Sequence, residues 1–222
     1  MAYRFGVRVK GEEGDLKISI DNFIGRRNGS YCYKDSFSKE LFESNPDTLE
    51  KALEEAKRNY RLNMLYYESL SSDDFNFCID SFKQQHRTFS QVEDLNDFNF
   101  PGVYILVLDR YKQVYVGVTK GKIKERIMQH WSKRFPLDRM LFGDLYSSRL
   151  PIDCFKAFDT TRIFAEQTQD LSSLEKKIVS EFPDCYLCNR TAGGLYEGGL
   201  GEAIVNRLRG RDLKRFESLL AD

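Results

Sequence analysis

The chain has 222 residues, 41% of them hydrophobic and 14% aromatic, a composition that supports one large or two small folded domains and excludes global disorder. Lysine and arginine number 34, as do aspartate and glutamate, so the formal net charge is zero, a balance unusual for a protein that binds nucleic acid. Five irregularly spaced cysteines argue against a disulfide framework and favour a reducing, cytoplasmic compartment. The lack of a signal peptide or of a membrane-length apolar run predicts no membrane partner.

The first 95 residues are predicted to form an N-terminal α+β region that serves in target recognition, dimerisation or regulation. Residues 3–10 and 16–20 alternate apolar and polar side chains, as half-buried strands do, across a glycine-containing turn. They therefore predict a hairpin, and residues 31–33 predict a short third strand. The arginines and asparagine of the loop between them indicate either a phosphate contact or ordinary surface.

Two helices are predicted to follow in this region. Residues 47–67 repeat apolar side chains at helical spacing after a good capping signal, which predicts a long amphipathic helix. Residues 75–89 are rich in aromatic side chains and predict a second helix. Residues 90–99 are polar and acidic, so we expect them to form a linker to the next domain.

A second hairpin is predicted in the middle of the chain. Residues 103–108 and 114–118 are apolar runs with β-branched side chains, separated by five mostly polar residues. The first run begins Gly102-Val103-Tyr104, and the second contains Tyr115-Val116-Gly117. The pattern predicts two antiparallel strands that each present a tyrosine.

The helix predicted after this hairpin combines an apolar stripe with two polar side chains. Ile123, Ile127 and Trp131 recur every four residues, with Thr119 as the expected cap. Arg126 and His130 are also four apart and share a neighbouring face. A pair of tyrosines beside an arginine and a histidine predicts a site that handles phosphate.

Farther along, residues 151–160 predict a third strand and residues 138–146 a short helix. A helix carrying Glu175 follows and ends at Pro183, and Asn189 lies shortly after it. Residues 201–222 predict a basic amphipathic helix, whose cations would contact a nucleic-acid backbone or form a solvated face. These cations are Arg207, Arg209, Arg211, Lys214 and Arg215.

Positive charge is concentrated on the predicted phosphate site. Residues 1–100 carry 14 basic and 18 acidic side chains, whereas residues 101–135 carry 8 basic and 2 acidic. Such a concentration would attract a phosphate backbone, although a solvated helix face gives the same count. The side chains predicted to contact nucleic acid are Lys120, Lys122, Lys124, Lys133 and Arg134.

Residues 98–196 resemble the GIY-YIG nuclease domain. GVY at 102–104 stands for GIY, and YVG at 115–117 stands for YIG. An arginine, a histidine one turn later, a helical glutamate and an asparagine follow in the family's order. The resemblance implies an α+β fold, with a small, mostly antiparallel three-stranded sheet flanked by helices over residues 96–200. It also implies a metal-dependent endonuclease that hydrolyses DNA.

The resemblance assigns roles to individual residues. Glu175 would anchor a single Mg²⁺ or Mn²⁺ ion, and Arg126 would bind the phosphate. Tyr104 would act as the base or orient water, Tyr115 would help to hold the phosphate or the water, and Asn189 would support the site by hydrogen bonding. His130 would relay a proton or orient Tyr104. The expected partner is double-stranded DNA, and a homodimer is left open.

Several alternatives stay open on the sequence alone. Glu166 and Glu181 compete with Glu175 for the metal, but lack its spacing to Asn189. Cys185 and Cys188 could belong to a zinc site, although two ordinary thiols are the simpler interpretation. A catalytically inactive nucleic-acid-binding protein and an RNA-cleaving nuclease are the rival functions. The C-terminal placement of the domain favours an enzyme of restriction, phage or defence type.

Overall fold

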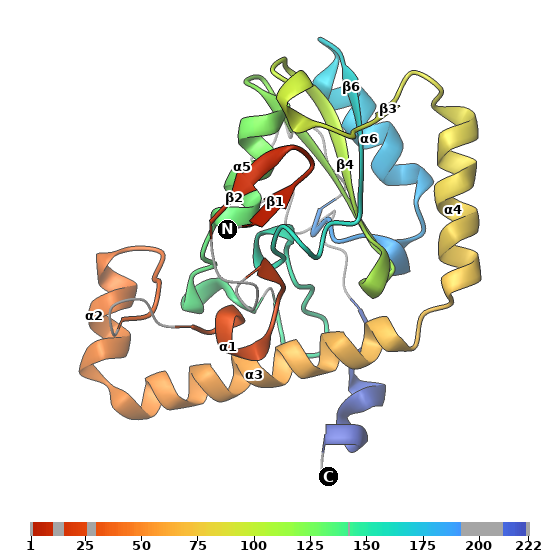
Figure 1. Ribbon diagram of the computed structural model, residues 1–222. Coiled ribbons are helices and arrows are strands. Elements are labelled where there is room, and N and C mark those ends of the chain that lie inside the picture. Colours follow the sequence, from red (N-terminus) through yellow and green to blue (C-terminus); the bar gives the residue numbers. More distant parts are fainter. Residues whose placement is uncertain (1, 11–15, 26–29, 142, 192–210, 221–222) are drawn as a thin grey trace.

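A computed structural model gives the arrangement of the chain as a mixed α+β fold (Figure 1). The predicted class is therefore confirmed at this level. The described residues are 2–10, 16–25, 30–141, 143–191 and 211–220.

The central feature is a four-stranded antiparallel sheet in the order β3-β6-β4-β5. Its strands are β3 (Ser90–Gln91), β4 (Gly102–Leu108), β5 (Gln113–Thr119) and β6 (Arg162–Gln167). The predicted hairpin is β4 and β5, with Tyr104 opposite Gly117. The sheet has four strands where three were predicted, and one of them, β3, has only two residues.

Helices cover both faces of this sheet. On one side lies α5 (Ile123–Ser132), and on the other lie α4 (Ser72–Gln85) and α6 (Leu171–Glu181) (Figure 1). The long α3 (Pro46–Glu68) runs across below the end of the sheet and adds side chains to the core on the α5 side. Every residue of β4 is buried, because alternate side chains along a strand enter the two opposite core clusters. The predicted helices at 47–67 and 75–89 correspond to α3 and α4, and the apolar stripe of α5 is buried as expected.

The N-terminal hairpin is shorter than predicted. It consists of β1 (Ala2–Arg4) and β2 (Val7–Val9), joined through Phe5 and Gly6. Both turn residues have positive φ, the geometry of a tight hairpin turn, so the chain reverses inside the segment predicted as one strand. The strand predicted at 16–20 is wrong, since α1 (Ile20–Phe23) begins there.

Two further N-terminal predictions need correction. Residues 31–33 form no strand, and α2 (Ser36–Ser44) follows them. Residues 90–99 are not a linker, because they contain β3 and the short 3-10 helix η2 (Leu95–Asp97), and Leu95 is buried. One core cluster includes side chains from both sides of this segment, such as Leu62 and Leu108.

The strand predicted at 151–160 is also wrong. The chain there forms the 3-10 helix η5 (Ile152–Cys154) and then a turn that Asp159 closes by accepting a hydrogen bond from the Lys156 amide at 2.8 Å. The third strand is β6, which begins at Arg162. Among the described residues of 138–146, predicted as a short helix, the helical structure is the 3-10 helix η4 (Leu137–Arg139).

The C-terminal segment differs from the predicted helix where it is described. Residues 211–213 are irregular, and η7 (Lys214–Leu220) is a 3-10 helix. Residues 201–210 of the predicted basic helix, with Arg207 and Arg209, lie outside the described residues. Within the described part of the chain, no helix is both long and apolar enough to cross a membrane.

Candidate active site

The two motif glycines are explained by close packing at β4 and β5. A Cβ at Gly102 would lie 2.1 Å from the carbonyl oxygen of Glu166 on β6, and a Cβ at Gly117 would lie 2.5 Å from the Tyr104 ring. Neither distance is tolerated by real atoms, so each site needs a residue without a side chain. Gly117 thereby makes room for Tyr104 on the face of the sheet covered by α5.

Tyr104 lies in a buried chain of hydrogen bonds. Its hydroxyl is 2.8 Å from Nε2 of His130, and Nδ1 of His130 is 2.5 Å from Oδ1 of Asp153 on η5. Oδ2 of Asp153 is 2.5 Å from Nζ of Lys133. The sequence pattern predicted that Tyr104 and His130 belong to one site, but nothing in the spacing of residues 151–155 marks the Asp153 carboxylate.

The second tyrosine and the arginine complete one side of the site. The rings of Tyr115 and His130 have centroids 5.3 Å apart, and those of Tyr115 and Tyr104 are 6.3 Å apart. Burial alone would lower the pKa of Arg126, but the neighbouring phenols of Tyr104 and Tyr115 raise it by more than burial lowers it. The net shift is upward, so the guanidinium stays charged. Arg126 and Tyr115 are half-buried, whereas Tyr104 is wholly buried.

Both phenols are held in the neutral form. Burial raises the pKa of Tyr104 well above its usual value, and Tyr115 raises it further, while the charge of Arg126 opposes the shift. Burial likewise raises the pKa of Tyr115, with a contribution from Glu175. Neither tyrosine therefore ionises at neutral pH without a base to accept its proton.

Glu175 lies on α6, across the sheet edge from α5, and its charge reaches Tyr115. Among the described residues, no group of three or more histidine, cysteine, aspartate or glutamate side chains gathers as a metal site would require. A single carboxylate still fits Mg²⁺, which commonly keeps several waters and takes substrate phosphate as a further ligand. The donor set fits a lightly held Mg²⁺ better than zinc or calcium.

The two carboxylates that competed with Glu175 have other partners. Glu166 accepts a hydrogen bond from Thr88 at 2.8 Å. Glu181 lies 2.5 Å from Nε2 of His86 and joins α6 to α4. Both partners, Thr88 and His86, lie in the segment that follows α4.

Asn189 acts on the backbone of β5. Its side-chain oxygen accepts a hydrogen bond from the Val116 amide at 3.0 Å, and its side-chain nitrogen donates to the Val116 carbonyl at 2.9 Å. The amide thus takes the place of a neighbouring strand at the outer edge of β5. This contact fixes the backbone between Tyr115 and Gly117.

Most of the cations predicted to bind nucleic acid have protein partners. Lys122 pairs with Glu125 at 3.0 Å, Lys124 donates to Asn96 at 2.7 Å, and Lys133 pairs with Asp153. Arg134 donates to the Gly25 carbonyl, and Lys120 is exposed at the end of β5. Surface pairs of this kind exchange readily for phosphate, so these contacts leave the prediction open.

Arg211 is a clear exception to the predicted basic C-terminal face. It is buried, donates to the Leu187 carbonyl at 2.9 Å and lies 4.6 Å from the ring centroid of Tyr66. The neighbouring Cys185 and Cys188 are free thiols, and burial raises the pKa of both. Arg211 is therefore packed inside the protein, whereas Lys214 and Arg215 of the same predicted face are exposed.

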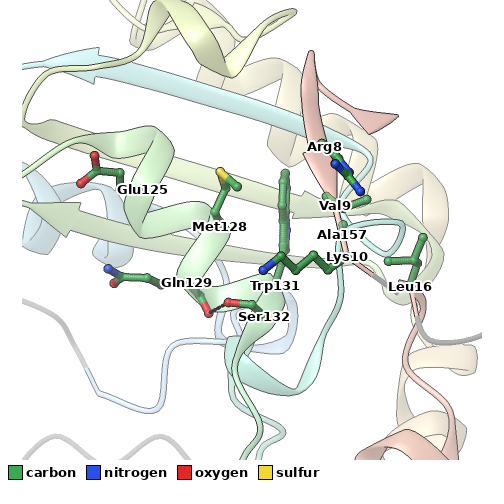
Figure 2. A pocket seen from close by; sticks show the side chains of 10 residues that line it. All are labelled: Arg8, Val9, Lys10, Leu16, Glu125, Met128, Gln129, Trp131, Ser132 and Ala157. Atoms are coloured by element: carbon green, nitrogen blue, oxygen red, sulfur yellow. Dashed lines mark hydrogen bonds between the residues drawn. The ribbon is translucent and has the colours of Figure 1, made fainter. Parts of the chain in front are cut away.

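A pocket of about 460 Å³ lies between the β1–β2 hairpin and the outer side of α5 (Figure 2). Met128 and Trp131 of α5 and Arg8 of β2 line it. Neither Arg126 nor His130 lines the pocket, but Gln129, which does, accepts a hydrogen bond from Arg126 at 3.3 Å.

The geometry brings Tyr104, Tyr115, Arg126 and His130 into one cluster, with the charge of Glu175 beside it. Such a cluster can bind a phosphate, orient a water molecule and pass a proton from Tyr104 to His130, whose imidazolium the Asp153 carboxylate would stabilise. No protein-family model, curated protein or solved structure matches the chain.

Proposed function

We propose that the protein is a metal-dependent endonuclease of the GIY-YIG type that hydrolyses phosphodiester bonds in DNA. The observation that carries the proposal is the cluster of four side chains, contributed by β4, β5 and α5, that lies beside a helical glutamate. The positive charge of residues 101–135 supports an anionic substrate.

Arg126 is the phosphate-binding group in this proposal. Its guanidinium stays charged and presents a planar set of donors that matches phosphate oxygens. Burial raises the pKa of the nearby Tyr104 hydroxyl, and the charge of Arg126 opposes that rise. When the guanidinium turns to a phosphate, it uncovers the buried phenol for the attacking water.

Tyr104 takes a proton from that water once its own proton has moved to Nε2 of His130. Tyr115 is half-buried at the entrance and, because it is neutral, can donate a hydrogen bond to a phosphate oxygen. Glu175 would hold Mg²⁺, which when bound stabilises negative charge on the phosphate and the leaving oxygen. Asn189 keeps the β5 backbone in register beneath these groups.

The test is nicking of supercoiled plasmid with Mg²⁺ or with EDTA. We expect cleavage with Mg²⁺ alone, and a loss of at least about 100-fold in rate for both Glu175→Gln and Arg126→Ala, the usual cost of removing one charge-stabilising group. Glu181→Gln is the matched control, since it changes the same side-chain type six residues later on the same helix and should retain the wild-type rate.

The outcomes separate the alternatives. Equal cutting by wild type and Glu175→Gln would refute the metal assignment. Cleavage of RNA but not DNA would favour the RNA nuclease, and binding without cleavage of either would favour an inactive nucleic-acid-binding protein. Loss of cutting in Glu181→Gln alone would transfer the metal role to that residue.

A further inference from the structure

Asp153 extends the tyrosine site inward by one more residue. Three consecutive polar contacts join β4, α5 and η5: Tyr104 Oη to His130 Nε2 at 2.8 Å, His130 Nδ1 to Asp153 Oδ1 at 2.5 Å, and Asp153 Oδ2 to Lys133 Nζ at 2.5 Å. The exposed fractions are 0% for Tyr104, 2% for His130 and 9% for Asp153. A polar chain this deep in the core is maintained only if each member satisfies the next.

The acceptor character of the carboxylate sets the direction of the chain. An ionised aspartate can only accept hydrogen bonds, so a neutral His130 beside it carries its proton on Nδ1. Nε2 is then left as an acceptor for the phenol of Tyr104. Burial raises the pKa of Asp153, but hydrogen bonds from His130 and Lys133 outweigh it and hold the pKa at about 2.

We propose that Asp153 is a positioning residue, which fixes His130 in the orientation and tautomer that accept the proton of Tyr104 during phosphodiester hydrolysis. This inference rests on the proposed nuclease function and adds a residue to its site. Asp153 touches neither water nor phosphate, and it acts only through His130.

The proton balance is simple. The O–H bond of Tyr104 breaks and an N–H bond forms at Nε2 of His130, which becomes an imidazolium stabilised by Asp153. The phenolate then takes a proton from the attacking water, whose oxygen bonds to phosphorus as the bond to the leaving oxygen breaks. The leaving oxygen takes a proton from solvent, and His130 returns its proton to solvent before the next cycle.

The surroundings argue for this role over a simple ion pair. The charged and titratable groups around the chain include Tyr115 on β5, Arg126 on α5 and Lys133 just after α5. Cys154, Lys156 and Arg190 also lie close enough to interact with the charge of Asp153. Lys133 is half-exposed, and pairs with such lysines stabilise a fold only weakly. The buried contact between Asp153 and His130 therefore matters more than the exposed pair between Asp153 and Lys133.

The first test reads the tautomer without any activity. The chain has two histidines, His86 and His130, so ¹⁵N-histidine spectra at pH 8 are assigned by comparison with His86→Gln. We expect a proton on Nδ1 of His130 in the wild type, and loss of this single tautomer in Asp153→Asn. A wild-type proton on Nε2 would overturn the inference, whatever the enzyme cuts.

The second test is a double-mutant cycle on plasmid nicking. In serine proteases, replacing the aspartate that orients the histidine by asparagine costs about 10⁴-fold in kcat, so we expect roughly 10²–10⁴-fold for Asp153→Asn with DNA affinity unchanged. His130→Gln combined with Asp153→Asn should be no slower than His130→Gln alone, because Asp153 acts through His130.

Asp159→Asn is the control for a purely structural loss. Asp159 is also a buried aspartate, but it accepts from the Tyr111 hydroxyl and from the amides of Ile18 and Lys156, each at 2.8 Å. We expect it to lower the melting temperature while kcat stays within a few-fold of wild type. Equal kcat losses in Asp153→Asn and Asp159→Asn would overturn the role of Asp153 and leave the proposed nuclease function standing. The same conclusion would follow if the losses of His130→Gln and Asp153→Asn multiplied in the double variant. No cleavage by the wild type would overturn the proposed function as well.

Discussion

At the scale of single residues, the tyrosine site is defined by steric limits as much as by charge. Tyr104 can occupy the sheet face under α5 only because position 117, directly opposite on β5, has no side chain. Gly102 is required for a different reason, because the Glu166 carbonyl approaches it too closely to leave room for a side chain. The two motif glycines therefore serve packing, and only the tyrosines take part in the proposed chemistry.

Gly117→Ala should inactivate the site without removing any catalytic group. The new methyl would lie 2.5 Å from the Tyr104 hydroxyl oxygen, so the ring must leave its position beside His130. We expect nicking to fall at least about 100-fold, since small displacements of reacting groups have effects of that size. Gly121→Ala is the control, because its methyl would meet Thr119 at an ordinary 3.6 Å. Matching rates for the two variants would show that Tyr104 tolerates the displacement.

Asp153 should also give the protein a distinct acid response. Its pKa is held at about 2, below the usual 3.8, so its ionised form stabilises the folded state above about pH 4 and this contribution is lost as the pH falls from 4 to 2. The shift corresponds to about 2 kcal/mol. We expect Asp153→Asn to unfold in less urea than wild type at pH 7, with the difference shrinking towards pH 3. A difference independent of pH would contradict the shift.

At the scale of elements, β5 is the strand on which the site depends, and its outer edge is completed by a side chain. Asn189 satisfies both peptide groups of Val116, and the Cys188 amide donates to the Val114 carbonyl at 2.8 Å. The edge strand that bears Tyr115, which we propose takes part in catalysis, is thus held from both sides. This explains how an asparagine with no chemistry of its own can matter to the site.

Asn189→Ala should loosen this edge locally. Two buried backbone groups would lose their partners, which costs about 1–3 kcal/mol for each group. We expect faster hydrogen exchange at the Val116 amide and a lower melting temperature. Asn189→Asp keeps the acceptor for that amide but sets an oxygen against the Val116 carbonyl, so it should be no more stable than the alanine variant. Unchanged exchange at Val116 would refute the contact.

The elements predicted correctly are those encoded by neighbouring residues. The β4–β5 hairpin and the stripe of α5 follow from local alternation and four-residue spacing. The predicted strand at 151–160 failed because Asp159 closes a turn onto Lys156 and also binds the distant Ile18 amide. Asp153 could not be found in advance, since its partners lie 20 and 23 residues earlier in the chain.

At the scale of the whole molecule, the N-terminal residues and the predicted nuclease segment share one core. Tyr67 of α3 packs against Tyr111 with ring centroids 5.8 Å apart, and Lys112 donates to the Tyr67 carbonyl at 3.0 Å. Leu62 belongs to the same buried cluster as Trp131. The sequence suggested a boundary near residue 95 because residues 90–99 are polar, yet Leu95 among them is fully buried.

A shared core predicts a single unfolding event. We expect calorimetry of the full chain to show one cooperative transition, because the buried cluster cannot be divided at residue 95 without exposing apolar surface on both parts. A fragment of residues 96–222 should show no cooperative melting by circular dichroism. A fragment that melts sharply near the wild-type temperature would show that the nuclease segment folds independently.

The completion of the β5 edge by Asn189 has a consequence for biosynthesis. The Val116 peptide group is made 73 residues before the amide that satisfies it, an interval of roughly 4–15 s at ordinary translation rates. Through that interval a nascent chain carries an unpaired strand edge, open to association with another newly made copy. Slower elongation over residues 117–189 prolongs this exposure and should lower the yield of correctly folded protein.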